Sequence, residues 1–548
     1  MLSSSTAIHQ FRSHFIAAAA LVCLVVNCAF AATLPSLPQS YINTDYLAPS
    51  GVVINVAAGG NLQAALDNAK LGDKVVLQAG ATFTGPFRLP NKATGSGWIY
   101  VVSSGYANLP APGTRVSPAD AVNMATIQVG TGGISTIETA DAAHHFRFVG
   151  IEFRPNVGSY VNTLIAIGGG DTSLATMPSD IVFDRCYVHG DAAIGGRRGF
   201  ALNGIRVAVV ESYVADFKED GADTQAVWAY NTPGPLKVVN NYLEAAGENL
   251  MIGGAEPRIQ NMVPSDIEIR DNHFFKPTSW VGSKWTVKNL IEFKLGVRVL
   301  VHHNIFENNW AGAQVGFAVQ LTPRNEGGTA PWAATRDISF TSNRFINAGS
   351  GFNISGADTN FSSQRTERVL IKNNVIDANA FGNASGRIFQ IINGPVDLTI
   401  ENNTMFGVQD WIYAENITAK VVRFTLQNNI TTHGRYGIMG TGTGIGQRTL
   451  DGQFTDWTMV KNALIGAQAA GLSASDYPAG NLFPTDIAAV QFVDYSGGNL
   501  RLAASSPYKG AGTDGKDLGA DIDSLPTRGS AVSAPTILPR PPTAIQVQ

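Results

Sequence analysis

Three charged residues, Glu292, Lys294 and Arg324, are the strongest candidates for chemistry in this sequence. Glu292 and Lys294 are two residues apart in KNLIEFKLG, so a β-strand there would turn both side chains toward the same face. Arg324 follows about one repeat later, in LTPRN. A cation can neutralise a carboxylate, and a Lys whose pKa is lowered by burial can remove a proton. These residue types therefore suit β-elimination from a uronic acid.

Polar and aromatic residues recur at equivalent places on the neighbouring predicted strands TQAVWAYN, ENLMIGG, NLIEFKLG, GFAVQLTPRN, GFNISG, RIFQIING and WIYAEN. Side chains alternate between the two faces of a strand, so these residues should form an outward row. Sugars offer hydroxyls to amides and C–H faces to aromatic rings. We expect substrate-binding residues at Trp228, Tyr230, Asn249, Gln320, Asn353, Gln390 and Tyr413. An ordinary hydrophilic sheet surface is the alternative interpretation of this row.

The elements that would position these residues follow from a repeat. One phrase, an apolar strand, two polar residues and another apolar strand, returns nine times between Ile181 and Thr431. The second polar residues form the column Cys186, Ser212, Asn241, Asn272, Asn304, Asn343, Asn374, Asn403 and Asn429. No copy has room for a helix, so the repeat predicts a solenoid of β-strands. Asn amides stacked about 4.8 Å apart would form a hydrogen-bonded ladder.

This column, with a strand before and after each bend, resembles the right-handed parallel β-helix of the pectate-lyase-like superfamily. The resemblance implies an all-β, single-stranded, right-handed parallel β-helix over residues 51–525. An amphipathic stretch, NLQAALDNAK, is expected to form a short helix that caps the first rung and protects its edge.

A second, partial resemblance is to the alginate-lyase branch of β-helix lyases. Gly253-Gly254-Ala255-Glu256 resembles the first motif of that branch, and Lys294 and Arg324 resemble its catalytic Lys and Arg. The resemblance implies that Lys294 is the base and that Arg324 is the acid or the clamp on the substrate carboxylate. It also implies that Glu256 and Glu292 hold a cation, with calcium as the expected cofactor.

Other functions remain open at this point. A glycoside hydrolase needs two carboxyl groups across the scissile bond, and the two acids of the outward row, Glu292 and Glu415, are four rungs apart. A C5 epimerase would share part of the lyase chemistry. A non-catalytic β-helix that binds glycan, or serves as a surface or adhesive module, is the alternative from a different class.

The ends of the chain predict export. Residues 1–31 hold an apolar run followed by Ala29-Phe30-Ala31, which is typical of a cleaved secretory signal. Residues 32–50 form a loose lead-in segment, and residues 526–548 form a Pro-rich, disordered tail. Cleavage would leave Cys186 as the one thiol, a small buried side chain that replaces Asn in the column. We therefore expect a secreted protein, extracellular or periplasmic, with no membrane span after cleavage.

Composition and charge limit the classes of molecule that this chain is expected to bind. The net charge is −4, and charged residues make up only 15% of the chain, without a basic patch. Nucleic acid is therefore not an expected partner. The expected partner is an extended, acidic polysaccharide, bound by a monomer.

Overall fold

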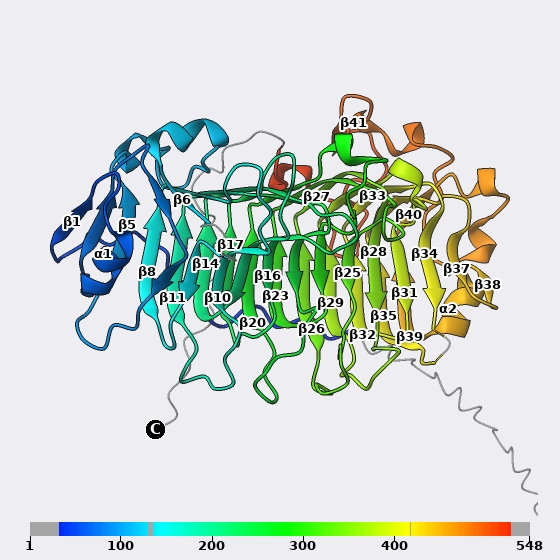
Figure 1. Ribbon diagram of the computed structural model, residues 1–548. Helices are drawn as coiled ribbons and strands as arrows, with labels where there is room; N and C mark the ends of the chain where they lie inside the picture. The colour runs from blue at the N-terminus through cyan, green and yellow to red at the C-terminus, as the bar shows by residue number, and fades with distance from the viewer. Residues whose placement is uncertain (1–31, 130–134, 417, 528–548) are drawn as a thin grey trace, which may run out of the picture.

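The protein is a right-handed parallel β-helix, as the repeat predicts (Figure 1). A computed structural model describes residues 32–129, 135–416 and 418–527. Three long sheets run along the solenoid, with fourteen, thirteen and thirteen strands. The first sheet precedes each Asn bend, the second follows it, and the third carries the predicted outward row. Strands of the same sheet on successive rungs pair in parallel over the described residues, apart from the antiparallel β37–β38 pair.

The first sheet contains, in spatial order, β1 (Val53–Val56), β2 (Lys74–Leu77), β5 (Ile99–Ser103), β8 (His144–Val149), β11 (Ser179–Asp184), β14 (Ile205–Val210), β17 (Leu236–Val239), β20 (Ser265–Arg270), β23 (Gly296–His302), β26 (Thr335–Thr341), β29 (Glu367–Lys372), β32 (Val396–Glu401), β35 (Val421–Gln427) and β39 (Phe454–Val460). The second contains β3 (Thr82–Thr84), β6 (Ala125–Gln128), β9 (Ile151–Arg154), β12 (Tyr187–His189), β15 (Tyr213–Phe217), β18 (Tyr242–Ala245), β21 (His273–Phe275), β24 (Ile305–Asn309), β27 (Arg344–Ala348), β30 (Val375–Ala378), β33 (Thr404–Gly407), β36 (Ile430–Thr432) and β40 (Ala463–Ile465). The third contains β4 (Phe87–Leu89), β7 (Ile137–Thr139), β10 (Thr163–Gly168), β13 (Arg198–Asn203), β16 (Gln225–Ala229), β19 (Glu248–Ile252), β22 (Ile291–Phe293), β25 (Phe317–Leu321), β28 (Ser350–Ser355), β31 (Phe389–Ile392), β34 (Asp410–Glu415), β37 (Gly437–Gly440) and β38 (Gly444–Ile445).

The Asn column forms the predicted ladder inside the bend between the first two sheets. Each amide donates to the Oδ1 of the next Asn, for example Asn304 to Asn343 at 3.0 Å and Asn343 to Asn374 at 3.0 Å. The backbone N–H of each Asn donates to the same oxygen, at 2.9 Å for Asn304. The ladder continues past the predicted column to Asn462 and Asn481. It satisfies buried polar groups along most of the solenoid.

Cys186 and Ser212 begin the column. The backbone N–H of Cys186 donates to the Ser212 hydroxyl at 3.0 Å, and that of Ser212 donates to Asn241 Oδ1 at 2.8 Å. Burial raises the pKa of the Cys186 thiol to about 12, so this thiol stays protonated. The structure therefore confirms that a small buried side chain replaces Asn here.

The interior is one continuous apolar cluster that extends from Val56 to Tyr477. Phe rings stack along it, as Phe274 and Phe306 do with centroids 4.5 Å apart. At the N-terminal end, helix α1 (Leu62–Asn68) buries Leu62 and Leu66 against this core, beside β1 and β4. The helix lies where the sequence predicts it, and its role in protecting the first rung's edge stays a prediction.

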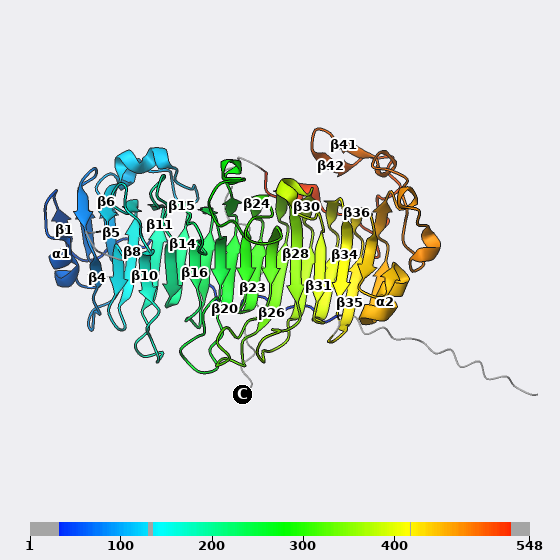
Figure 2. The ribbon, with the colours of Figure 1, turned by 45° about the vertical axis from the view of Figure 1, so that its right-hand side comes forward.

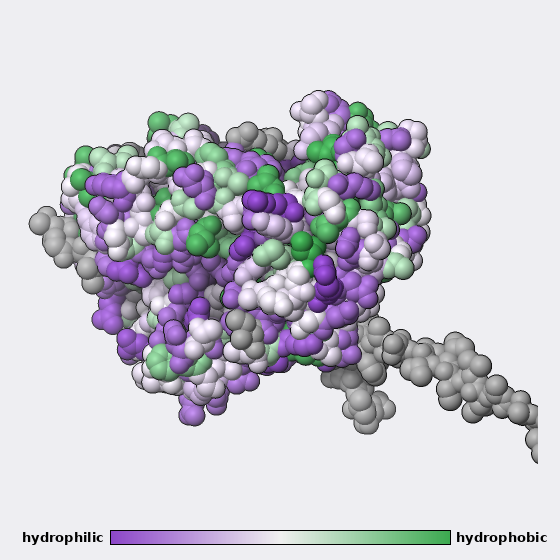
Figure 3. All heavy atoms as spheres, turned by 90° about the vertical axis from the view of Figure 1, so that its right-hand side faces the viewer, coloured by the Kyte–Doolittle hydropathy of each residue, from purple (hydrophilic) through white to green (hydrophobic). Residues whose placement is uncertain are grey.

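The C-terminal end is covered by α2 (Gln447–Gln453) and by the chain that follows it (Figure 2). Leu450 of α2 is fully buried in the core cluster. A small antiparallel pair, β41 (Phe492–Asp494) and β42 (Asn499–Leu502), projects above the solenoid. Viewed onto this end, apolar residues are scattered among polar ones rather than forming one continuous surface (Figure 3). The apolar core is therefore not exposed on that face.

The lead-in segment follows the outside of the first sheet without forming a helix or strand. Its backbone N–H groups at Thr33, Ser36 and Gln39 donate to carboxylates on three separate rungs, at 2.8, 3.0 and 2.8 Å. The acceptors are Asp397, Asp337 and Asp266, so the segment runs opposite to the direction in which the solenoid grows. The segment is thus attached to the solenoid over much of its length.

The predicted signal peptide, residues 1–31, lies outside the described residues, as does most of the predicted tail. The domain limits at residues 51 and 525 stay predictions. Within the described part of the chain, no helix is long and apolar enough to cross a membrane.

The ladder gives a stability prediction. Asn343→Ala removes donors to Val301 O and Asn374 Oδ1 and leaves the backbone N–H of Asn304 without its acceptor. We expect the free energy of unfolding in urea to fall by about 2–4 kcal/mol. The matched control is Asn360→Ala, at an exposed side chain, which should change it by less than about 0.5 kcal/mol. Equal losses in both variants would contradict the structural role of the ladder.

Candidate functional site

The third sheet places most of the predicted outward row in one line along the solenoid. Consecutive register partners across β16, β19, β22, β25, β28, β31 and β34 are Trp228, Met251, Glu292, Gln320, Asn353, Gln390 and Tyr413. These strands lie side by side on one face of the molecule (Figure 1). Five of the seven predicted substrate-binding residues are therefore aligned, with Glu292 among them.

The amides of this line are hydrogen-bonded in one direction. Arg387 donates to Gln390 Oε1 at 3.3 Å, and Gln390 donates to Asn353 Oδ1 at 3.2 Å. Asn353 donates to Gln320 Oε1 at 2.6 Å, and Gln320 donates to Gln314 Oε1 at 3.2 Å. Each amide has two N–H groups and an oxygen with two lone pairs, so each keeps one donor and one acceptor site unused by this chain. The row can therefore offer hydrogen bonds to a ligand while its own geometry is fixed.

An aromatic ring with an Arg beside it stands at each end of the row. The guanidinium of Arg198 lies 4.2 Å from the centroid of the Trp228 ring, and that of Arg387 lies 4.0 Å from the centroid of Tyr413. Tyr230 stacks against Trp228 at 4.7 Å, but it is nearly buried and its hydroxyl donates to Gly169 O. Of the predicted aromatic residues, Trp228 and Tyr413 are thus the more exposed.

Glu292 belongs to a buried cluster of charges near the middle of the row. Its side chain is largely covered, and burial, followed by repulsion from Glu248, raises its pKa to about 8. Glu248 is fully buried, and burial, followed by the charge of Asp223, raises its pKa as well. Lys288 Nζ lies 2.5 Å from an Asp223 oxygen and 3.8 Å from a Glu248 oxygen. At neutral pH Glu292 is therefore mainly a neutral carboxylic acid beside the ion pairs of Lys288.

The sequence interpretation did not include Glu248, because it assumed strict alternation along the strand, nor Lys288, which lies in the loop before β22. Asn249 is fully buried, and its amide hydrogen-bonds to main-chain carbonyls of β18 and β21 in the second sheet, so it does not lie in the outward row. The prediction that Asn249 faces outward is therefore wrong. Its amide donates to Leu243 O and Phe275 O, at 2.7 and 2.8 Å, inside the solenoid.

A buried lysine supports the bend in front of Glu248. Lys276 Nζ donates to the carbonyls of Ala245, Ala246 and Gly247, at 2.7, 2.8 and 2.8 Å. Burial lowers its pKa to about 7, although the carboxylates of Glu248 and Glu244 oppose this. Three carbonyls converging on one ammonium fix the backbone from which Glu248 projects.

Lys294 is held as an ammonium ion. Its Nζ lies 2.8 Å from a Glu326 oxygen. Burial acts to lower the pKa of Lys294, but the carboxyl groups of Glu292 and Glu326 outweigh it, and the pKa is raised. The expectation that the groove lowers this pKa toward neutrality is therefore wrong for the ligand-free protein, because sequence spacing did not reveal Glu326.

Arg324 lies one rung from Lys294, as predicted. Its backbone N–H donates to Lys294 O at 3.0 Å, and its guanidinium donates to the buried carboxylate of Asp358 at 2.8 Å. Gly253 passes close to Lys294 on the other side, since a Cβ there would lie 2.6 Å from Lys294 Cβ. The two predicted catalytic residues thus lie on adjacent rungs, and each side chain pairs with a different carboxylate.

Glu256 has a different environment from the predicted one. Its carboxylate accepts from the N–H groups of Gly327 and Thr329, at 2.9 and 2.8 Å, and from the Thr329 hydroxyl. These bonds lower its pKa against the effect of burial and tie two loops together beside the groove. Calcium needs six to eight oxygen ligands. Glu256 and Glu292 together supply at most four carboxylate oxygens, and those of Glu256 already accept hydrogen bonds from Gly327 and Thr329. Among the described residues, no group of three or more His, Cys, Asp or Glu side chains could hold a metal ion.

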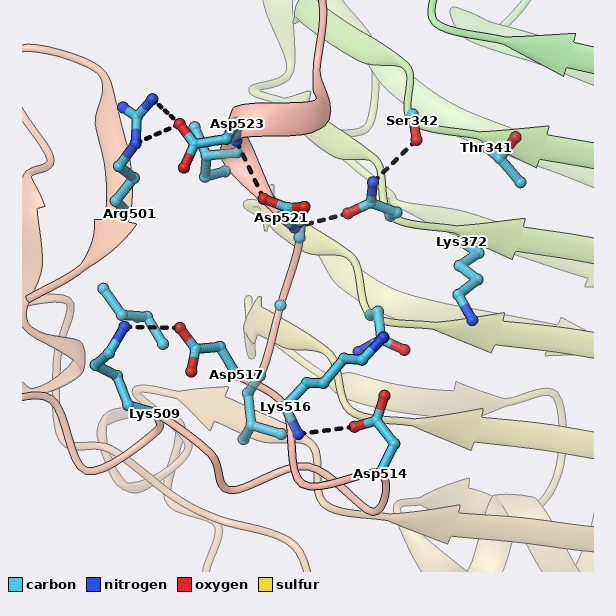
Figure 4. A pocket seen from close by; sticks show the side chains of 17 residues that line it. Thr341, Ser342, Lys372, Arg501, Lys509, Asp514, Lys516, Asp517, Asp521 and Asp523 are labelled. Atoms are coloured by element: carbon cyan, nitrogen blue, oxygen red, sulfur yellow. Dashed lines mark hydrogen bonds and ion pairs between the residues drawn. The ribbon is translucent and has the colours of Figure 1, made fainter. Parts of the chain in front are cut away.

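A second cleft lies away from this row, between the outer side of the Asn bends and the C-terminal segment (Figure 4). It encloses about 670 Å³. Many of its charges are paired, as Lys509 is with Asp517 at 2.9 Å and Arg501 with Asp523. Asn373 on the solenoid accepts from the N–H of Asp521. These contacts attach the C-terminal segment to the solenoid, and no predicted site residue lines this cleft.

No family model matches this sequence, and no curated protein matches it. Among solved structures, the chain is similar to the PL6 family alginate lyase AlyGC, with a TM-score of 0.54 and 14% identity over 88% of this chain. A mutant of that lyase matches with a TM-score of 0.50 and 14% sequence identity over 89% of this chain. A mannuronic acid specific family 6 lyase from human gut microbiota matches with a TM-score of 0.47 and 12% sequence identity. That match covers 80% of this chain and 92% of the lyase. The chain covers 58% of AlyGC and 59% of its mutant. At this identity, the similarity to AlyGC shows the β-helix fold alone.

The raised pKa of Glu292 predicts a pH-dependent stability. The folded protein keeps this proton up to about pH 8, whereas the unfolded chain releases it near 4.5, so deprotonation of the unfolded chain favours unfolding as pH rises between these values. Glu292→Gln cannot titrate. We expect it to gain at least about 2 kcal/mol of stability relative to the parent between pH 5 and pH 9. The measurement is urea unfolding at several pH values, and a difference that does not change with pH would contradict the assignment.

Proposed function

We propose that this chain is a secreted polysaccharide lyase that cleaves an extended acidic polysaccharide by β-elimination. One observation carries the proposal. A neutral carboxyl, Glu292, lies on β22 within a line of amides and aromatic rings, a fixed ammonium, Lys294, follows directly after β22, and Arg324 is one rung away. The names of the solved lyases with this fold, which act on alginate, point to the same class of substrate.

Lys294 and Arg324 would bind the uronate carboxylate of the sugar that reacts. Each cation now pairs with one protein carboxylate, Glu326 or Asp358. Glu326 is partly exposed and lies in a loop, so a substrate carboxylate could displace it, whereas Asp358 is buried. Neutralising the uronate carboxylate makes the adjacent C5 proton more acidic and stabilises the charge that develops in the transition state.

Two residues are candidates for the base that removes the C5 proton. The sequence resemblance assigns it to Lys294, which would have to lose its proton after Glu326 moves away. Glu292 is the alternative, because a carboxyl with a pKa of about 8 is partly ionised in mildly alkaline solution. In either case, the base takes the proton from C5, a C4–C5 double bond forms, and the C4–O glycosidic bond breaks as its oxygen is protonated.

The first test is ultraviolet absorbance of the unsaturated uronate product. The purified protein, without residues 1–31, is mixed with alginate, pectate and other acidic glycans, with and without calcium. We expect absorbance to rise on one class of polymer. Binding without a rise in absorbance or in reducing ends would instead support the non-catalytic glycan-binding function. A rise in reducing ends alone would support hydrolysis.

Two variants separate the candidate bases. Lys294→Ala should abolish turnover under both assignments, with nearly unchanged thermal unfolding. Lys294→Arg keeps the positive charge but cannot release its proton in this pH range. If Glu292 is the base, Lys294→Arg keeps measurable activity that rises as pH increases through about 8, and Glu292→Gln has none. If Lys294 is the base, Lys294→Arg is inactive at every pH. Full activity of Lys294→Ala would contradict both assignments.

A further inference from the structure

Arg198 lies on the third sheet, at the N-terminal end of the row. It begins β13, and its register partner on the next rung is Gln225. Its Nε donates to Gln225 Oε1 at 2.9 Å, and its guanidinium lies 4.2 Å from the Trp228 ring centroid. These two contacts fix the plane of the guanidinium over the aromatic ring. The side chains of Arg198 and Trp228 remain partly exposed.

Arg198 differs from the stacked Arg at the other end of the row in its charge balance. Arg387 is paired with the fully buried carboxylate of Asp410 at 2.7 Å. Within the part of the chain that the structure describes, no carboxylate is within ion-pair distance of Arg198, and its two Nη groups donate no hydrogen bond. The nearest acids already have cationic partners, since Lys288 contacts both Asp223 and Glu248.

The surroundings of Arg198 favour an anionic ligand. Burial, followed by repulsion from Arg197, lowers the pKa of Arg198 to about 10, so the guanidinium is charged but poorly solvated. A partly buried cation without a counterion gains more from a carboxylate than an exposed one does. The planar group can also bind a carboxylate through two parallel hydrogen bonds.

The distance along the solenoid relates Arg198 to the proposed reaction centre. β13 is separated from β22, which carries Glu292, by three steps between rungs, through β16 and β19. At about 4.8 Å a step, this is about 14 Å. A ligand that reaches both places must therefore span several sugars. It would pass over Trp228 and Met251 on the same face.

We propose that Arg198 and Trp228 form a subsite that binds the carboxylate of a uronic acid unit several sugars away from the bond that breaks. This rests on the proposed function, and it adds a direction and a minimum length to the substrate. An acidic oligomer bound at the reaction centre extends toward the N-terminal end of the solenoid. Arg198, oriented by its contact with Trp228, holds one of its distal carboxylates.

The test measures binding by isothermal titration calorimetry, with every variant made in the Lys294→Ala background to prevent cleavage. The probes are dimers and hexamers of mannuronate, guluronate and galacturonate, together with a hexamer of neutral glucose. We expect Arg198→Gln to weaken binding of the preferred acidic hexamer about ten- to a hundred-fold. Binding of the dimer and of the neutral hexamer should stay within about two-fold of the parent. Arg198→Lys keeps the charge but loses the planar group, so its affinity for the acidic hexamer should lie between those of the background protein and of Arg198→Gln.

The control is Arg448→Gln, which removes one positive charge at an exposed position of α2, at the other end of the solenoid. It should leave hexamer binding unchanged.

Three results would overturn the subsite: no effect of Arg198→Gln on any acidic hexamer, an equal loss with the neutral hexamer, or no binding of any acidic hexamer by the background protein. If binding depends on Arg198 but the protein with Lys294 intact gives no unsaturated product, the subsite stands and the lyase function fails. If unsaturated product forms but Arg198→Gln binds the acidic hexamers as tightly as the background protein does, the lyase function stands and the subsite fails.

Discussion

The hydrogen-bonded Asn ladder is the constraint on which the other features of this structure depend. Each buried amide joins two rungs, and a one-residue shift of a rung would leave the amides on both sides without partners. The ladder therefore fixes the register of successive rungs at the bend between the first and second sheets. Since every rung starts from the same point, residues at equivalent places fall into straight lines along the solenoid.

The groove is a consequence of this register. Gln320, Asn353 and Gln390 can donate to one another only because their strands are aligned, with direct partners on adjacent rungs. The same alignment places Glu292 within the influence of Glu248 on the neighbouring rung. A single carboxyl on an isolated strand would be solvated and ionised. Between packed rungs it is desolvated beside a second acid, and its pKa rises into a range that is useful for proton transfer.

What could be predicted from the sequence depends on how regular each part of the rung is. The column from Asn241 to Asn429 and the row from Glu292 to Gln390 recur at fixed places in a phrase, so they were predictable. The bend into the third sheet follows loops of varying length and breaks the alternation, which is why Asn249 was assigned to the wrong face and Glu248 was missed. Glu326 and Arg198 lie outside the aligned phrases. Their contacts with Lys294 and Trp228 depend on loop paths and rotamers that periodicity does not specify.

The lead-in segment depends on the same register. Neighbouring rungs of the first sheet pair Asp with Arg, as in Asp266 with Arg298 and Asp337 with Arg368, so an Asp recurs every second rung. Two rungs span about 9.6 Å, and three extended residues span about 10 Å. The N–H groups that bind these carboxylates are three residues apart, at Thr33, Ser36 and Gln39. Because its first acceptor, Asp397, belongs to β32, the segment can complete its contacts only after the rungs from β20 to β32 have formed. The start of the described chain is therefore secured by rungs whose residues come hundreds of positions later in the sequence.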